Sequence, residues 1–230
     1  MKLAIVGDGR MARAIAAEAA AVGDEVVVML GLEENHGACG ITTARLGQVD
    51  VVCEFTAPDA VVANLQALKR IGARVVCGTT GWDAERQGIE AAWRSGPGAL
   101  LAASNFALGV HLFFTAARAL AAAAAARPEF DGFLHERHHA AKLDAPSGTA
   151  MSLQRIVRDA NPSRAWPVTS VRAGMTPGEH ELVLDAPFES ITLRHVARDR
   201  RVFAAGALTA ARWLQGRQGV FTLEAMLQGV

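Results

Sequence analysis

The sequence predicts an α/β fold with two domains, and two features of its hydrophobic pattern support this. Up to residue 103, short apolar runs rich in branched residues alternate with segments of helical periodicity, which is typical of βαβ units and a parallel sheet. After residue 130, extended segments follow one another, which favours a second domain with an antiparallel or mixed sheet. The length of 230 residues is sufficient for two such domains.

Five strands are expected in the first half of the chain, at 2–7, 25–30, 50–55, 73–77 and 98–103. Helices are expected between them, at 11–22, 59–71 and 83–95. The helix at 59–71 carries Val61, Leu65 and Leu68 on one apolar stripe. The segment 31–48 has no clear period and is expected to be a loop.

Residues 98–126 are apolar, with Arg118 as their one charged residue, and the segment is long enough to suggest a membrane span. Ser104, Asn105 and His111 interrupt it, however, and its alanines are only weakly hydrophobic. We therefore expect a buried strand, a polar loop and an alanine-rich helix, and no membrane span.

The second half has a different pattern. Extended segments are expected at 130–137, 168–174, 180–185 and 189–197, and helices at 149–160, 203–215 and 222–228. Apolar residues alternate along two of the extended segments, with Leu182 and Leu184 in one and Ile191 and Leu193 in the other. This alternation indicates strands with one buried face.

Composition argues against several classes of protein. The formal net charge is zero, so no electrostatic footprint indicates binding to nucleic acid or to a membrane. The three cysteines lack CxxC spacing, and Cys53 and Cys77 end apolar runs, so we expect buried thiols and neither a disulfide framework nor a metal site. The apolar stretch in MKLAIVGDGR is too short for a signal peptide, and we expect a cytoplasmic protein.

A glycine-rich motif follows the first expected strand and opens the first helix. Residues 7–12 read G-x-G-x-x-A, in which Gly7 permits the tight turn, Gly9 lets a pyrophosphate approach the backbone and Ala12 keeps helix and strand close. The alternative is an ordinary strand-to-helix turn. The position of the motif favours a dinucleotide-binding Rossmann domain.

The second strand should end near a residue that reads the adenosine ribose. An acidic residue there favours NAD, and an arginine favours NADP. Glu33 and Glu34 follow that strand slightly late, and no lysine or arginine lies between the strand and Arg45. The two glutamates mildly favour NAD, or they belong to a solvated loop.

Residues 136–150, ERHHAAKLDAPSGTA, gather groups that suit reduction of an anionic substrate. His138 can deliver a proton near neutral pH, and Lys142 adds a positive charge. Gly148 and Thr149 offer backbone N–H groups at the start of a helix, where anions bind. Taken singly, the histidine pair could be a surface feature or a metal site, and the Ser-Gly-Thr turn a simple helix cap.

This segment resembles the signature of the dihydrodipicolinate reductases, E-x-H-H-x-x-K-x-D-A-P-S-G-T-A, and other motifs agree in order along nearly the whole chain. These further motifs lie at 7–11, 54–56, 78–82, 104–106, 109–110, 171–174, 178–180 and 205–207.

The resemblance implies reduction of 4-hydroxy-tetrahydrodipicolinate to tetrahydrodipicolinate with NADH or NADPH, in diaminopimelate and lysine biosynthesis. It implies that His138 is the catalytic acid aided by Lys142, and that His139, Lys142, Gly148 and Thr149 contact the dicarboxylate substrate. The residues that it assigns to the cofactor are Gly7, Asp8, Gly9, Arg10, Met11, Gly78, Thr79, Thr80, Ala103, Ser104, Asn105 and Phe106.

The resemblance also implies an architecture, with a dinucleotide-binding domain at 1–107 and 202–230, a smaller α+β domain for substrate binding and oligomerisation at 108–201, and a homotetramer. The chain departs from the family at the cofactor end. It is short between 31 and 50, has Ala12 and Ala57 where relatives carry glycine and arginine, and lacks a clear acid for the ribose. The alternative function is another Rossmann-fold NAD(P)-dependent dehydrogenase of a small dicarboxylate or an amino acid, and a second is a nucleotide-binding regulator.

Overall fold

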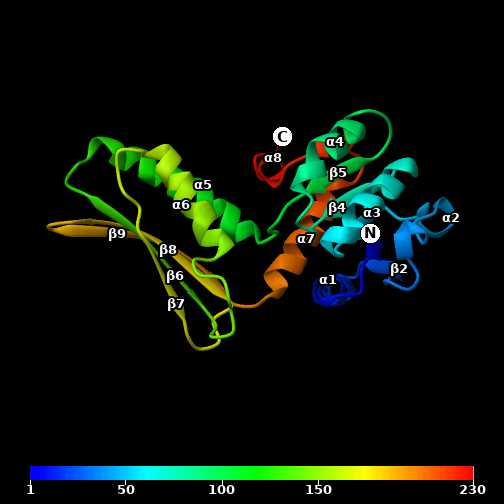
Figure 1. Cartoon of the computed structure of the whole chain (residues 1–230), viewed down its shortest axis with the longest axis horizontal. Helices are drawn as coiled ribbons and strands as arrows, with labels where there is room; N and C mark the ends of the chain where they lie inside the picture. The colour runs from blue at the N-terminus through cyan, green and yellow to red at the C-terminus, as the bar shows by residue number, and fades with distance from the viewer. Residues whose placement is uncertain (230) are drawn as a thin grey trace. The chain divides into compact units, whose positions relative to one another are not determined.

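A six-stranded parallel sheet organises the first part of the computed structural model, which describes residues 1–229 (Figure 1). Its strands are β1 (Lys2–Val6), β2 (Glu25–Leu30), β3 (Val51–Glu54), β4 (Arg74–Cys77), β5 (Ala99–Ala102) and β10 (Gly219–Phe221). They lie in the order β10-β5-β4-β3-β1-β2. Because β1 has β2 on one side and β3 on the other, the winding reverses at β1, and ligands of such sheets bind at this switch point.

Helices cover both faces of this sheet (Figure 1). They are α1 (Arg10–Ala21), α3 (Pro58–Arg70), α4 (Asp83–Arg94), α7 (Arg201–Leu214) and α8 (Leu223–Leu227). Alternate strand residues point to opposite faces, and neighbours such as Ile5 and Val6 are both fully buried, as expected of a covered parallel sheet. Cys53 and Cys77 are buried as predicted, and burial raises the pKa of Cys53 to about 12.

Two details of this part differ from the sequence-based expectation. The segment expected as a loop contains the 3-10 helix η1 (His36–Ala38) and the single turn α2 (Thr43–Leu46), which the Thr42 side chain caps by accepting a hydrogen bond from Arg45 N at 3.3 Å. Strand β10 was not expected at all. Each of these elements is too short to show a hydrophobic period, so only tertiary pairing reveals it.

A four-stranded mixed sheet forms the second part of the chain, as the sequence predicted. Its strands are β6 (Asp131–His138), β7 (Val168–Arg172), β8 (Gly178–Ala186) and β9 (Glu189–Ala197), in the order β7-β6-β8-β9. The β6–β7 pair is parallel, and the other two pairs are antiparallel.

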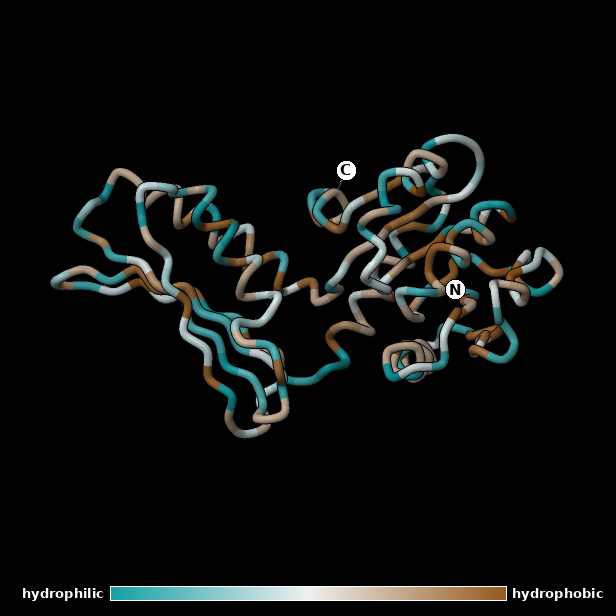
Figure 2. Tube along the Cα trace, in the orientation of Figure 1, coloured by the Kyte–Doolittle hydropathy of each residue, from teal (hydrophilic) through white to brown (hydrophobic). Residues whose placement is uncertain are grey.

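Two helices, α5 (Leu108–Ala123) and α6 (Gly148–Ala160), cover one face of this sheet, and the 3-10 helix η2 (Ala124–Ala126) extends α5 (Figure 1). Brown and teal residues alternate along their turns in Figure 2, as expected of amphipathic helices. Phe113, Leu134, Leu153 and Trp166 belong to the core between helices and sheet.

Among the described residues, one helical stretch, Leu108–Ala126, is long and apolar enough to cross a membrane by length and composition alone. Phe113, Ala117, Ala121 and Ala124 of this stretch pack into the core against the four-stranded sheet. That packing accounts for its apolar composition, and the segment has the strand, loop and helix that the sequence predicted.

The chain divides into two compact units. The first comprises Met1–Phe106 together with the chain from Phe203 onward, and the second comprises Ala107–Val202. The six-stranded sheet belongs to the first unit and the four-stranded sheet to the second. Each unit carries part of the predicted site.

Candidate active site

The glycine motif forms the turn between β1 and α1. Gly7 has a φ of +117°, and an ideal Cβ placed on it would lie 2.1 Å from the carbonyl oxygen of Phe55. Only glycine fits this turn. An ideal Cβ on Gly9 would meet no atom within 4 Å, and Gly9 precedes α1 without a side-chain cap. The helix therefore begins with open space and uncapped N–H groups, which is the arrangement that binds a pyrophosphate.

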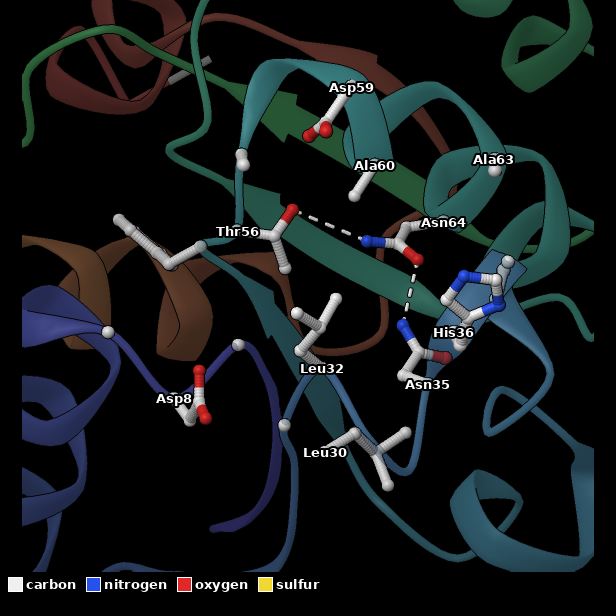
Figure 3. A pocket seen from close by; sticks show the side chains of 17 residues that line it. Asp8, Leu30, Leu32, Asn35, His36, Thr56, Asp59, Ala60, Ala63 and Asn64 are labelled. Atoms are coloured by element: carbon white, nitrogen blue, oxygen red, sulfur yellow. Dashed lines mark hydrogen bonds between the residues drawn. The ribbon is translucent and has the colours of Figure 1, made fainter.

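A cavity of about 470 Å³ lies beside this turn, at the switch point of the sheet (Figure 3). The glycine loop, the end of β2, the 3-10 helix η1 and the start of α3 enclose it. Asn35 donates a hydrogen bond to Asn64 at 2.9 Å, and Asn64 donates one to Thr56 at 3.3 Å, so one polar chain runs along its wall (Figure 3). A cavity of this size is typical of a small-molecule site.

Two carboxylates converge at the end of β2. The Glu34 side chain accepts a hydrogen bond from Gly31 N at 3.0 Å. An ideal Cβ on Gly31 would lie 3.0 Å from an oxygen of Asp8 and 3.0 Å from an oxygen of Glu34. The turn after β2 thus brings Glu34 back to the strand end, although in sequence it comes late. Among the described residues, neither lysine nor arginine lines this cavity.

A second cavity of about 290 Å³ joins the glycine loop to the segment after β4. Gly9, Arg10 and Met11 line it together with Gly78, Thr79 and Thr80, so these two groups of predicted cofactor residues do meet. Gly78 is required sterically, because an ideal Cβ on it would lie 2.0 Å from the ring of Phe55.

Glu54, which is fully buried at the end of β3, ties these loops together. Its carboxylate accepts hydrogen bonds from Thr56 Oγ1, from Thr79 Oγ1 at 2.6 Å and from Asn64 Nδ2 at 3.0 Å. Sequence reasoning included Glu54 in a family motif but gave it no role. The sequence did contain a signal for this role, namely a glutamate at the end of an otherwise apolar strand. A carboxylate buried there must accept hydrogen bonds from nearby donors.

The predicted residues after β5 are not among the described residues that line the two cavities. Phe106 stacks in a tilted arrangement on Phe55, with ring centroids 5.8 Å apart, and Ala103 N donates to Cys77 O at 3.1 Å. Of the residues that the structure describes, Ala103, Ser104 and Asn105 line neither of the two cavities. These residues lie in the loop that follows β5, at the carboxyl-terminal edge of the parallel sheet.

In the second unit, His138 ends strand β6 and is 6% exposed. Its Nδ1 is hydrogen-bonded to Glu136, two residues earlier on the same strand face. Glu136 also accepts hydrogen bonds from Arg172 at 2.6 Å and from Ser147 N at 3.3 Å. Burial lowers the pKa of His138, although the carboxylate of Glu136 acts in the opposite direction.

His180 lies on the neighbouring strand β8, with its ring 5.2 Å from that of His138. Burial, followed by the charge of His138, lowers the pKa of His180 to about 4. Ligand atoms of Glu136, His138 and His180 lie within 4.8 Å of one another, a spacing that a metal ion would also need. Because Glu136 and His138 bond to each other and His180 Nε2 lies 3.2 Å from Ser147 Oγ, we assign them to a hydrogen-bond network.

Helix α6 begins at Gly148, one residue before the predicted start, with Ser147 as its cap. Ser147 Oγ accepts a hydrogen bond from Ala150 N at 3.2 Å. An ideal Cβ on Gly148 would meet no atom within 4 Å, and Gly148 is exposed while Thr149 is half-buried. The positive end of the helix is therefore open to an anion.

Lys142 forms an ion pair with Asp144, with Nζ 2.7 Å from a carboxylate oxygen. The hydrogen bond from Lys142, with a smaller contribution from Gly148 N, lowers the pKa of Asp144. Lys142 is close enough to His138 for its charge to lower the pKa of that histidine. Asp144 thus pairs with the cation that the sequence assigned to a substrate carboxylate, and it lies close to the open helix start.

His139 lies in a different cavity, of about 600 Å³, which it lines with Arg198 and Arg200. A guanidinium nitrogen of Arg200 lies 3.1 Å from His139 Nε2. Because arginine can only donate, Nε2 accepts, and the Nδ1 of His139 is left to carry the proton. The sequence analysis did not single out Arg198 or Arg200. Their clustering just after β9 could have indicated a site for an anion.

Comparison with known proteins identifies the family of this chain. The family model for the N-terminus of dihydrodipicolinate reductase matches residues 1–106, and that for the C-terminus matches residues 109–227. The chain belongs to the dihydrodipicolinate reductase family.

Individual relatives support the same placement. The 4-hydroxy-tetrahydrodipicolinate reductase of Gluconobacter oxydans is 41% identical over 192 residues, which cover 76% of this chain and 75% of the relative. The reductase of that name from Christiangramia forsetii is 30% identical over 99% of this chain and 98% of its own. A dipicolinate-bound dihydrodipicolinate reductase from Paenisporosarcina has the same fold, with a TM-score of 0.77 at 23% identity over 96% of this chain and 97% of its own.

Proposed function

We propose that this protein reduces 4-hydroxy-tetrahydrodipicolinate to tetrahydrodipicolinate with a reduced nicotinamide nucleotide, in diaminopimelate and lysine biosynthesis. One observation carries the proposal: residues 136–150 fold into a single site that combines a buried, oriented His138, the cation of Lys142 and the open start of α6. Curated relatives with the name of this enzyme support it.

The family uses a pyridine nucleotide, and the first unit has the features needed to hold one. The open space at Gly9 and the uncapped start of α1 suit the pyrophosphate, and the cavity at the end of β2 suits the adenosine. We assign 7–11, 78–80 and 103–106 to cofactor binding and the segments 1–107 and 202–230 to the nucleotide domain. When bound, the reduced nicotinamide supplies a hydride to the substrate ring.

The second unit, assigned to 108–201, holds the substrate. Its dicarboxylate calls for two anchors that donate hydrogen bonds, and we assign Lys142 with the Gly148–Thr149 helix start to one and His139 to the other. Asp144 must release Lys142 when a substrate carboxylate takes its place. The ring loses its hydroxyl as water, accepts the hydride, and takes a proton from His138.

The adenosine cavity favours NADH over NADPH. A 2′-phosphate at the end of β2 would face the carboxylate of Asp8, which lines the cavity, with that of Glu34 close by at Gly31 N and no lysine or arginine among the lining residues described. A 2′-hydroxyl can instead donate a hydrogen bond to a carboxylate. We expect kcat/KM to be at least about tenfold higher with NADH, equivalent to about 1.4 kcal/mol.

Comparing Glu34→Gln with the neighbouring exposed control Glu33→Gln tests this preference. We expect the first substitution to shrink the NADH preference and the second to leave it unchanged. Equal kcat/KM with both cofactors in the unsubstituted enzyme would refute the assignment.

The exposed face of the four-stranded sheet suits self-association into the homotetramer expected from the family. Phe133, Val171 and Val196 are 38–42% exposed on that face, although large apolar side chains on an open sheet are normally covered. Sedimentation of the purified protein should give the mass of four chains, and a monomer would refute this. We expect the enzyme to work in the cytoplasm.

The reaction is tested by coupling the protein to dihydrodipicolinate synthase supplied with pyruvate and aspartate semialdehyde. We expect the absorbance of the reduced nicotinamide to fall only when both enzymes are present. Turnover of an amino acid or a semialdehyde, without turnover of the synthase product, would favour the alternative dehydrogenase. Cofactor binding without turnover of any of these substrates would favour a regulator.

A further inference from the structure

Glu136 lies beside His138 in a position that fixes the orientation of the histidine ring. It is 1% exposed, and the two residues share the buried face of β6 because side chains alternate along a strand. One carboxylate oxygen of Glu136 bonds His138 Nδ1, and the other accepts hydrogen bonds from Arg172 and from Ser147 N. Both oxygens are therefore occupied by groups from β6, β7 and the turn before α6.

Arg172 keeps this carboxylate charged and in place. It ends strand β7, directly beside His138 in the sheet register. Its guanidinium donates to Glu136 at 2.6 Å and to the backbone oxygen of Asp144 at 2.5 Å. Burial alone would raise the pKa of Glu136, but the hydrogen bond from Arg172 leads the interactions that instead lower it to about 2.

We propose that Glu136, held by Arg172, is a positioning residue that fixes the proton of His138 on Nδ1 and leaves Nε2 as the atom that exchanges a proton with the substrate. A carboxylate accepts hydrogen bonds and cannot donate them, so the Nδ1 that it bonds must carry a proton. This proposal rests on the role of His138 in the proposed reaction.

The surroundings of Nε2 agree with that role. An ideal Cβ on Gly178 would lie 3.0 Å from Nε2, so glycine keeps that side of the ring clear. The charged and titratable groups facing His138 are Glu136 on its own strand, Arg172 on β7, His180 on β8 and Lys142 in the following turn. Glu136 alone among these four stabilises the protonated imidazole, because the other three are cationic or can become so.

Glu136→Gln tests the proposal in the synthase-coupled assay, because it keeps the shape of the side chain and removes its charge. We expect kcat to fall about tenfold or more, with KM for the substrate changed less than about threefold. The pKa that governs kcat should move to lower pH, since the protonated imidazole loses its counter-ion. Glu136→Asp retains the charge but shortens the side chain. Its pH profile should lie close to that of the unsubstituted enzyme, while its kcat should remain lower.

Glu179→Gln is the matched control. Glu179 is 4% exposed in the same sheet and pairs with Arg137 at 2.5 Å and with Arg194, but it does not contact His138. We expect its loss to affect thermal stability without moving the pH profile. Equal shifts in both variants, or an unchanged profile in Glu136→Gln, would overturn the proposal.

The tautomer can be read directly in the unsubstituted protein, which removes any dependence on how a variant folds. Nitrogen-15 NMR of the histidine rings, above the pKa of His138, should show a proton on Nδ1 and none on Nε2. The reverse tautomer would overturn the positioning role even if the coupled assay succeeds. Failure of the coupled assay with the expected tautomer would instead contradict the proposed reaction.

Discussion

The two glycines of the turn after β1 should respond to the same substitution in opposite ways. Gly7→Ala places a methyl group on a residue with a φ of +117° and 2.1 Å from the carbonyl oxygen of Phe55. The left-handed backbone costs about 1–2 kcal/mol for a residue with a Cβ, and forcing an extra group into a packed site costs about 1–3 kcal/mol. We therefore expect the free energy of unfolding to fall by about 2–5 kcal/mol.

Gly9→Ala meets neither obstacle, because the φ of Gly9 is −71° and its Cβ position is empty. The free energy of unfolding without cofactor should stay within about 0.5 kcal/mol of the unsubstituted protein. The methyl group would occupy the space through which a pyrophosphate approaches the backbone. We expect KM for NADH to rise about tenfold or more, which corresponds to about 1.4 kcal/mol of lost binding.

Denaturant unfolding without cofactor and steady-state kinetics with varied NADH separate these effects. Gly9→Ala should unfold like the unsubstituted protein and bind the cofactor poorly, whereas Gly7→Ala should be destabilised before cofactor is added. An unchanged KM for NADH in Gly9→Ala would refute the assignment of this turn to the pyrophosphate. Equal stability of the two variants would refute the steric argument.

The remaining predictions concern the second unit. His138→Gln and Lys142→Ala should each lower kcat by about 10²-fold, the usual scale for general acid catalysis, and near-normal rates in the coupled assay would contradict their roles. The pKa of His180 is lowered to about 4 in the folded protein, so as the pH falls below about 6.5 this histidine is protonated in the unfolded chain before it is protonated in the folded one. The free energy of unfolding should therefore fall by roughly 3 kcal/mol between about pH 6.5 and pH 4. In His180→Asn, denaturant unfolding over the same pH range should show a smaller fall. Gly132→Ala should destabilise the unit by about 1–3 kcal/mol, because an ideal Cβ on Gly132 lies 2.5 Å from the ring of Trp166; an unchanged melting temperature would show that the ring can move aside.

The sequence predicted the layers of the fold because its signals were local. Alternating apolar runs and helical stripes predicted the α/β unit and the mixed sheet, and the glycine motif placed the turn between β1 and α1. Strand β10 escaped prediction because its three residues acquire a partner only when they pair with β5. The same holds for the single turn of α2.

The candidate site was predicted where its residues are adjacent in sequence and missed where they are not. His138, Lys142 and Gly148 lie within one segment, so their conjunction was visible. Arg172 is 36 residues from Glu136, and Arg200 is 61 residues from His139, so only the fold joins them. The register between β6 and β7, which no local pattern specifies, sets Arg172 beside His138.

Glu34 shows the same limit at the cofactor end. Counted along the chain it comes four residues after β2 ends at Leu30, which is late for a ribose contact. The turn at 31–34 folds its carboxylate back to Gly31 N, a geometry that residue counting misses. Spacing rules assume a standard turn, and the turn at 31–34 brings Glu34 closer to the strand end than such rules predict.

The transfer of deuterium from labelled cofactor to product tests the proposed reaction most directly. The synthase product would be incubated with this protein and NADH carrying deuterium at the transferred position, and the product would be analysed by mass spectrometry. We predict tetrahydrodipicolinate with one deuterium bound to ring carbon for each cofactor oxidised. Cofactor oxidation without deuterium in that product, or no oxidation at all, would contradict the assignment.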